Sequence, residues 1–192
     1  MAVAPRSDHT HVLLVRGINV GGHAKVPMAH LRRIATAADA LEASTILNSG
    51  NVLFRVDRQA GPQADADAWD IAYRVQSALE SELGLTVTVI PASRAELATA
   101  LALHGRLGFA GGEDRLTHLA LLAEPAGPEQ AEALETLDAG EDRCAVSGRF
   151  VWLRYANASH SSKLSLDRIE RTLGTRATAR NLLTVRRLAA VA

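Results

Sequence analysis

The fold is indicated first by residues 11–22, which read HVLLVRGINVGG. The apolar run Val12–Val15 predicts a buried strand, and the three glycines that follow it predict an irregular connection. Pro27 then fits the first position of a helix that we expect to end near Asp39. The chain is therefore expected to begin with a strand, a glycine-rich connection and a helix.

A hairpin and a second helix are expected next. The β-prone runs Ser44–Leu47 and Val52–Val56 are separated by Asn-Ser-Gly-Asn at residues 48–51, a sequence suited to a tight turn with positive φ. Apolar residues then recur at every fourth position through residues 71–83, and Gly84 fits the end of a helix.

A fourth strand completes the first half of the chain. Leu85, Val87 and Val89 alternate with threonines and predict a strand that Pro91 ends. The order predicted for residues 1–92 is therefore strand, helix, strand, strand, helix, strand. This is the split βαβ or ferredoxin-like plan, in which two helices cover one face of a four-stranded antiparallel sheet.

Residues 93–192 are expected to form a second α+β subdomain with basic C-terminal helices. Ser93 and Glu96 have the spacing of a capping box at the start of a helix. The later predictions are a strand at 117–122, a helix from 128, a hairpin at 143–146 and 150–155, a helix at 166–173, and a final helix capped by Thr178. This order predicts a rearranged version of the first ferredoxin-like subdomain with an extra C-terminal helix.

Formal charges are distributed unevenly, although they sum to zero. Residues 1–56 carry six basic and three acidic groups, residues 57–142 carry five and sixteen, and residues 143–192 carry ten and two. Two basic regions around an acidic one favour phosphate-bearing partners if the ends of the chain meet in the fold. The alternative is that these charges lie on solvated helix faces.

The composition excludes several classes of protein. Hydrophobic residues make up 47% of the chain and charged residues 22%, as in globular domains that fold without disulfides. Cys144 is the one cysteine, and the seven histidines have no recognised metal-binding spacing. Neither a signal peptide nor a membrane span is recognised, so we expect a cytoplasmic protein with no membrane partner, metal or cofactor.

Several motifs relate the sequence to a known family. They are Arg16-Gly-Ile-Asn-Val-Gly-Gly22 with Lys25 and Met28, Asn48-Ser-Gly-Asn-Val52, Leu119–Leu122, Ser162-Lys-Leu164, and Thr178-Ala-Arg-Asn181 with Thr184 and Val185. With these motifs the sequence resembles the bacterial family called domain of unknown function 1697, almost from end to end. The resemblance implies paired ferredoxin-like subdomains, and it implies no assigned activity.

Residues 16–22 form the first predicted binding element, because backbone N–H groups of a glycine-rich segment can approach an anion closely. The polar turn at residues 49–51 is the second. The first and third strands are predicted antiparallel neighbours, so the exit of one adjoins the entrance of the other, and we expect the two elements to lie close together. For residues 16–22 the alternative is a tight connection between strand and helix that binds nothing. For residues 49–51 it is a turn whose side chains hydrogen-bond only to the local backbone.

The start of the final helix is the third predicted element, because its N–H groups and dipole favour anions and Arg180 adds a bidentate donor. The predicted ligand-binding residues are Arg16, Gly17, Asn19, Gly21, Gly22, Lys25, Ser49, Asn51, Lys163, Arg180 and Asn181. These residues predict a pocket for a phosphorylated metabolite or nucleotide. Lys163 is the candidate acid or base if the protein is an enzyme.

Two other functions are compatible with the sequence. The basic C-terminal region suggests a nucleic-acid-binding module, although Phe54 is the one aromatic residue in the first and third predicted strands, where RNA-binding sheets stack bases. A protein-interaction module predicts a large exposed apolar patch instead of a polar pocket.

Overall fold

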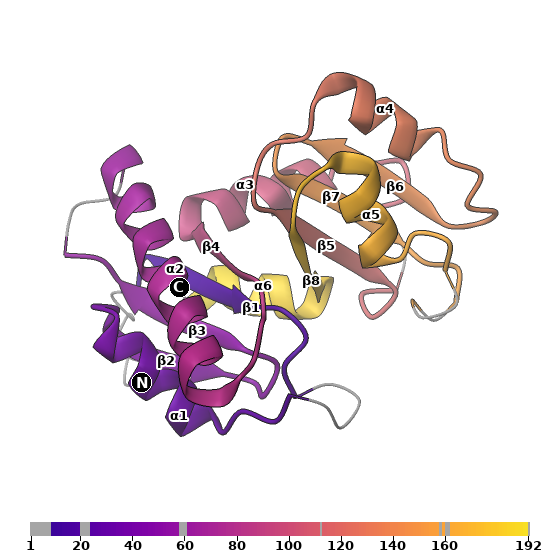
Figure 1. The fold of residues 1–192 in the computed structure, drawn as a ribbon. Helices are drawn as coiled ribbons and strands as arrows, with labels where there is room; N and C mark the ends of the chain where they lie inside the picture. Colours follow the sequence, from indigo (N-terminus) through magenta and orange to yellow (C-terminus); the bar gives the residue numbers. More distant parts are fainter. Residues whose placement is uncertain are drawn as a thin grey trace. The chain divides into compact units, whose positions relative to one another are not determined.

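The chain is an α+β protein with two four-stranded antiparallel sheets, shown in Figure 1. The computed structural model describes residues 9–19, 24–57, 61–111, 113–157, 159 and 162–191. Two compact units are distinguished: residues 1–97 with 187–192, and residues 98–186. The subdomain boundary predicted between residues 92 and 93 stays a prediction, and helix α3 (Arg94–His104) continues from the first unit into the second.

The first unit has the element order expected from the sequence. Its elements are β1 (His11–Val15), α1 (Met28–Ala37), β2 (Leu41–Ile46), β3 (Asn51–Arg55), α2 (Pro62–Leu83) and β4 (Val89–Ser93), with the sheet order β2-β3-β1-β4. Alternate residues of the central strands, such as Leu13 and Phe54, pack with Leu31 of α1 and Leu79 of α2. The two helices therefore bury one face of the sheet.

The second unit repeats this order. Its elements are the C-terminal part of α3, β5 (Thr117–Leu122), α4 (Pro128–Glu135), β6 (Arg143–Ser147), β7 (Phe150–Arg154), α5 (Leu166–Leu173), β8 (Ala177–Asn181) and the start of α6 (Leu182–Val191), with the sheet order β6-β7-β5-β8. Leu134 of α4 and Ile169 of α5 pack on Val151 and Leu153. On the opposite face, Trp152 Nε1 donates to the Ala100 carbonyl of α3 at 3.0 Å.

A final helix is present as predicted, but its predicted start and the rearranged order of the second half were wrong. The helix was predicted to begin at its cap Thr178, but residues 177–181 form β8 and pair with β5 across the register His118↔Asn181 to Leu122↔Ala177. Helix α6 begins at Leu182, and the Asn181 side chain accepts the Thr184 N–H at 2.9 Å. Thr178 is therefore a buried strand residue and not a helix cap. With β8 counted, the second unit has the same order as the first.

The fourth strand was predicted too early in the sequence. It spans residues 89–93 and contains Pro91, which pairs with Leu13 of β1. Proline is tolerated there because β4 is an edge strand, and an edge strand has one side on which an N–H is not needed for pairing. Leu85 and Val87 pack against the core from outside the strand, which explains their apolar alternation.

Other local predictions are confirmed. Ser93 and Glu96 form the capping box, since the Ser93 N–H donates to Glu96 Oε2 at 3.0 Å and the Glu96 N–H donates to Ser93 Oγ at 3.2 Å. Gly84 follows α2 as its C-cap, and the hairpin of β6 and β7 turns at Gly148. Within the described ranges, no helix combines the length and the apolar character required to cross a membrane.

Candidate binding site

Asn19 organises the connection between β1 and α1. Its backbone adopts a positive φ of 56°, which asparagine tolerates better than most residues. Its N–H donates to the Ala24 carbonyl at 3.1 Å, its Nδ2 donates to the Val26 carbonyl at 2.9 Å, and its Oδ1 accepts the Val26 N–H at 2.9 Å. These three bonds hold the end of the loop that leads into α1, at Ala24 and Val26, against Asn19.

The same asparagine joins this loop to the hairpin turn between β2 and β3. Asn19 Nδ2 also donates to the Asn48 carbonyl at 2.8 Å, and the Val15 N–H donates to the Gly50 carbonyl at 2.8 Å. The prediction that the connection after the first strand and the Asn-Ser-Gly-Asn turn lie close together is confirmed by these bonds. Antiparallel pairing of β1 with β3 is the reason.

Asn51 has a structural role within the turn. Its side chain is fully buried, and its Nδ2 donates to the Ile46 carbonyl at 3.0 Å and to Ser49 Oγ at 3.1 Å. Both amide hydrogens of Asn51, like those of Asn19, are therefore used inside the protein. A ligand-orienting role for these two asparagines stays a prediction that no contact here supports.

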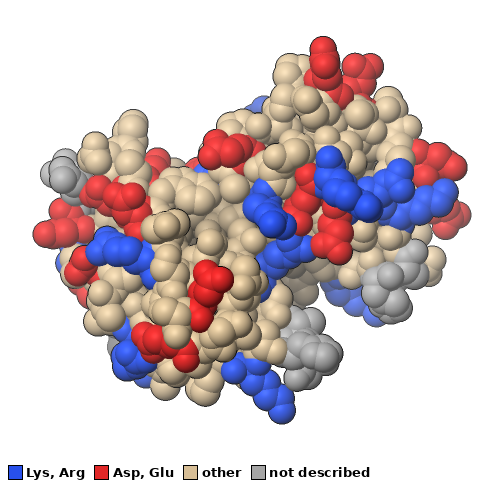
Figure 2. All heavy atoms as spheres, viewed as in Figure 1, with Lys and Arg blue, Asp and Glu red and all other residues tan. Residues whose placement is uncertain are grey.

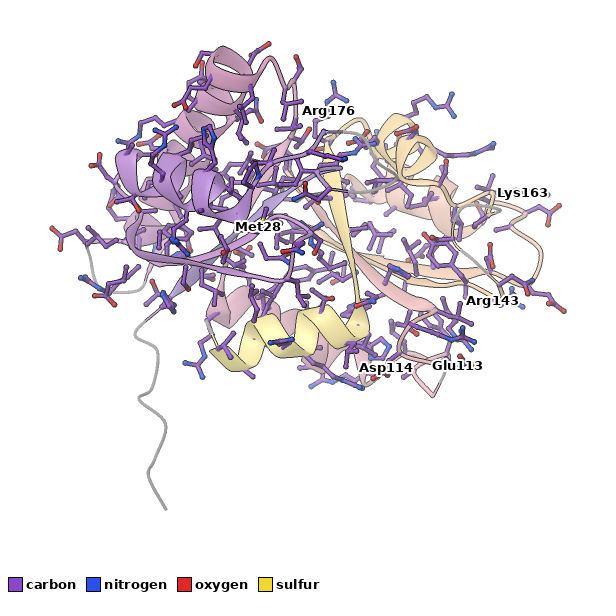
Figure 3. All side chains as sticks on the ribbon, turned by 90° about the horizontal axis from the view of Figure 1, so that it is seen from below. Met28, Glu113, Asp114, Arg143, Lys163 and Arg176 are labelled. Carbon is purple, nitrogen blue, oxygen red and sulfur yellow. The ribbon has the colours of Figure 1, made fainter. Side chains whose placement is uncertain are left out.

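A hollow of about 520 Å³ lies beside the loop and the turn. The described residues that line it are Asn19, Lys25, Val26, Pro27, Met28 and Asn48. None of them is acidic, and Lys25 is exposed and makes no ion pair with a described residue. Met28, labelled in Figure 3, is the first residue of α1, whose first turn has no acidic residue and no side-chain cap. The hollow therefore presents positive charge and an apolar wall.

The other predicted residues of the first unit are placed as follows. Arg16 is half-buried, and its N–H donates to the Thr88 carbonyl at 2.8 Å. Gly17 is exposed and has a φ of 68°. Gly21 and Gly22 lie outside the described residues. The lining by Val26, Pro27 and Met28 was not predicted, although Pro27 at a helix start placed this segment next to the loop.

Lys163 and Arg180 belong to the second unit and lie apart within it. Lys163 Nζ donates to the Asp138 carbonyl at 3.1 Å and lies 3.5 Å from Asp138 Oδ2. Arg180 follows Ala179, which packs on the α4 and α5 side of the sheet, so its side chain is on the opposite face. The predicted pocket combining these cations with Arg16 and Lys25 stays a prediction.

Arg180 was predicted as an anion ligand at the start of a helix; the placement at a helix start is wrong, and the role of anion ligand stays a prediction. It lies on β8, where its Nη1 donates to Thr178 Oγ1 at 3.0 Å and to the Ala179 carbonyl at 2.8 Å. Burial lowers the pKa of Arg180 to about 10, so the guanidinium still carries its charge at neutral pH. Asn181 is occupied by capping α6.

The remaining reactive groups are buried or scattered. Burial raises the pKa of the Cys144 thiol to about 11 and that of the Tyr155 phenol to about 12, so neither ionises near neutral pH. In the part of the chain that is described, no three side chains of histidine, cysteine, aspartate or glutamate gather as a metal site. On the face seen in Figure 2, basic and acidic side chains are interspersed over the second unit.

The fold and site define an α+β protein of two similar units with a small basic hollow in the first. The chain belongs to the family described as "Protein of unknown function (DUF1697)", whose model matches residues 9–152. The predicted family resemblance is thereby confirmed. No curated protein matches the sequence.

A solved structure supports the fold. The chain is similar to the one described as "The structure of conserved bacterial protein SP0830 from Streptococcus pneumoniae", with a TM-score of 0.67 and 20% sequence identity. The similarity covers 94% of this chain and 96% of that chain. At this identity the likeness extends to the fold and not to a ligand or a reaction.

Proposed function

We propose that the protein binds a phosphorylated small molecule, a metabolite or a nucleotide, at the hollow lined by Lys25, Asn48 and the first residues of α1. The observation that supports this most is the hollow's composition: one exposed ammonium, an exposed amide and no carboxylate among the described lining residues. An ammonium on a flexible stem is a common phosphate ligand.

The apolar wall narrows the class of ligand. Val26, Pro27 and Met28 offer no charge and no free side-chain donor, so they suit the carbon skeleton or the base of a phosphorylated compound. The N–H groups at the start of α1 add a favourable field for the phosphate. Inorganic phosphate alone would leave this wall uncovered.

The proposal concerns binding, and catalysis is left open. Lys163, the candidate acid or base from the sequence, already donates to Asp138 in the second unit. We further propose that each unit is a ferredoxin-like module and that the protein is cytoplasmic. The sheet orders β2-β3-β1-β4 and β6-β7-β5-β8 support the first of these statements.

The test compares the two lysines of the chain. Purified parent, Lys25→Gln and Lys163→Gln proteins are titrated calorimetrically with AMP, ATP, glucose 6-phosphate and acetyl phosphate. We expect one of these ligands to bind the parent and Lys163→Gln equally, and Lys25→Gln at least about tenfold more weakly, because a charged hydrogen bond is lost. Equal affinity for all three proteins would contradict the proposal.

A further inference from the structure

A pair of arginines faces the same way across β6 and β7. Arg143 and Arg154 are direct partners in the antiparallel register of the two strands. Cys144 and Leu153, the next pair along, pack against the core under α4 and α5. Since side chains alternate along a strand, both arginines are on the opposite face of the sheet. In Figure 3, Arg143 lies below the strands of the second unit, and the helices α4 and α5 lie above them.

Like charges placed directly opposite each other destabilise a sheet. Among the described residues, no carboxylate forms an ion pair with either arginine, so no described acidic group neutralises the pair directly. The residues of this unit outside the description, 112, 158, 160 and 161, are not acidic. The fold therefore keeps two cations together at a cost in stability.

The nearby carboxylates are already occupied. Asp142 accepts the Ala156 N–H at 2.8 Å and the hydroxyl of Ser162. Glu113 lies close enough to Arg154 for that charge to help lower its pKa, but it bonds Arg115, with Glu113 Oε2 at 2.5 Å from Arg115 Nε. These two carboxylates do not balance the three positive charges of Arg115, Arg143 and Arg154, so the local sum is still positive.

Hydrogen bonds to backbone carbonyls hold both guanidinium groups and use only some of their N–H donors. Arg143 Nη1 donates to the carbonyls of Gly140 and Asp142, both at 2.8 Å, and Arg154 Nη1 donates to the Tyr155 carbonyl at 2.9 Å. These bonds use one nitrogen of each side chain. The Nε and Nη2 hydrogens of each, which form the fork that grips an oxyanion, have no described partner.

We infer that Arg143 and Arg154 together bind a phosphate oxyanion on the second unit. This site is separate from the hollow beside Lys25 and does not depend on the function proposed for it. The bound phosphate accepts from both forks and removes the repulsion between them. A pyrophosphate group of a small ligand and the backbone of a nucleic acid share this chemistry, and the experiment distinguishes them.

The test replaces one arginine at a time by glutamine in a protein that already carries Lys25→Gln. The Lys25→Gln substitution weakens phosphate binding at the hollow in the first unit. The variants are Arg143→Gln, Arg154→Gln and the control Arg168→Gln, which removes one exposed charge from α5 on the other face of the sheet. Each protein is titrated at low ionic strength with sodium pyrophosphate and with a short single-stranded oligothymidylate, and its melting temperature is measured without ligand.

We expect pyrophosphate to bind the background protein and the Arg168→Gln control, and to lose at least about tenfold in affinity in each of the other two variants. We also expect these two variants to melt about 1–2 °C higher than the background protein when no ligand is present, because the repulsion is relieved. If oligothymidylate alone shows this dependence, the phosphate belongs to a nucleic acid backbone and the assignment of the two arginines holds.

Two results would overturn the inference. One is that neither probe distinguishes Arg143→Gln and Arg154→Gln from the background protein. The other is that Arg168→Gln weakens binding as much as they do, since the effect is then one of net charge and not of the paired forks.

Discussion

The two units share a topology and differ in the connection between their first strand and the helix after it. In the first unit, residues 16–27 lead from β1 to α1, whereas in the second, residues 123–127 lead from β5 to α4. Both connections contact the neighbouring hairpin turn. The longer one lines a hollow with Lys25 and Met28 and no described acidic residue. The shorter one bonds Thr175 and Arg176, which line a hollow that also contains Asp167 and Glu170. The repeated fold therefore does not repeat the charge of its hollow.

The hairpin turns differ in the same way. In the first unit the turn is held by Asn51 and by Asn19, whose amide reaches it from the connection. In the second, the Ala126 N–H donates to the Gly148 carbonyl at 3.0 Å, and Arg149 Nε donates to the Leu122 carbonyl at 2.9 Å. The turn of the second unit is thus held by a backbone bond and an arginine side chain, where asparagine side chains hold the turn of the first unit.

The units agree at their last strands. Gln76 of α2 accepts the Val89 N–H of β4 at 3.2 Å, and Glu170 of α5 accepts the Ala177 N–H of β8 at 2.8 Å. In both cases a helix side chain satisfies a donor at the edge of the sheet. An edge donor satisfied in this way is no longer available for pairing with another strand.

The largest expected effect separates the two turn glycines. Gly50 has a φ of 77°, and a Cβ placed there would lie 2.8 Å from two carbons of Ile18, whereas Gly148 has a φ of 57° and open space around it. We expect Gly50→Ala to lower the free energy of unfolding by about 2–4 kcal/mol, from backbone strain and overpacking together. Gly148→Ala should cost about 1–2 kcal/mol, from strain alone.

Urea unfolding of the parent and both glycine variants measures this difference. If both substitutions lower the free energy of unfolding equally, the connection packs on both turns alike. The proposed difference between the two units at their turns would then be wrong.

The edge bonds give a smaller effect. Glu170 is charged, its side chain is only 11% exposed, and its Oε2 lies 3.7 Å from Arg176 Nη1, whereas Gln76 is neutral. We expect Glu170→Ala to cost about 1.5–3 kcal/mol and Gln76→Ala about 0.5–1.5 kcal/mol, in line with the strengths of charged and neutral hydrogen bonds. Both are measured by urea unfolding, with Glu170→Gln as the variant that keeps an acceptor. A Glu170→Gln protein as unstable as Glu170→Ala would argue against the hydrogen bond.

The smallest effect concerns buried histidines. His11 of the first unit lies 3.1 Å from the Asp65 carboxylate, whereas His104 Nε2 and His118 Nδ1 of the second unit have no described hydrogen-bond partner. Burial lowers the pKa of both His104 and His118 from the ordinary 6.5, and the charge of Arg186 adds to this for His104. As the pH falls through 6.5, the unfolded chain therefore binds protons that the folded unit does not.

Stability should accordingly fall between pH 7 and the lowered pKa values and then stop falling from this cause. The free energy of unfolding of the parent and of a His104→Phe, His118→Phe variant, measured at pH 7.5, 6.5 and 5.5, checks the sign. The variant should lose less stability than the parent over this range. An equal loss would mean that other groups, and not these histidines, set the acid response.

Prediction from the sequence succeeded where a local pattern coincided with a tertiary role. The apolar run Val12–Val15 and the helical spacing in α2 each predicted an element that the structure contains. The pattern failed for β8, Ala-Thr-Ala-Arg-Asn, because it has few apolar residues and its pairing partner β5 is far away in sequence. The prediction for β4 ended the strand at Pro91, because proline interrupts most strands. The sequence does not show that β4 lies at the edge of the sheet, where proline is tolerated.

The predictions for the candidate site also succeeded where a local pattern was enough and failed where contacts between distant residues decide. The sequence by itself determined that the glycine-rich connection lies close to the Asn-Ser-Gly-Asn turn. Its periodicity gave the order of strands and helices, and that order predicted that the first and third strands are antiparallel neighbours. Whether each polar side chain faces a ligand or the backbone depended on contacts between distant residues. Only the tertiary structure assigned Asn19 and Asn51 to backbone carbonyls, left Lys25 exposed in the hollow and placed Arg143 opposite Arg154. The physical reason is that periodicity reports burial, whereas hydrogen-bond partners and charge pairing are set by neighbours that the chain acquires on folding.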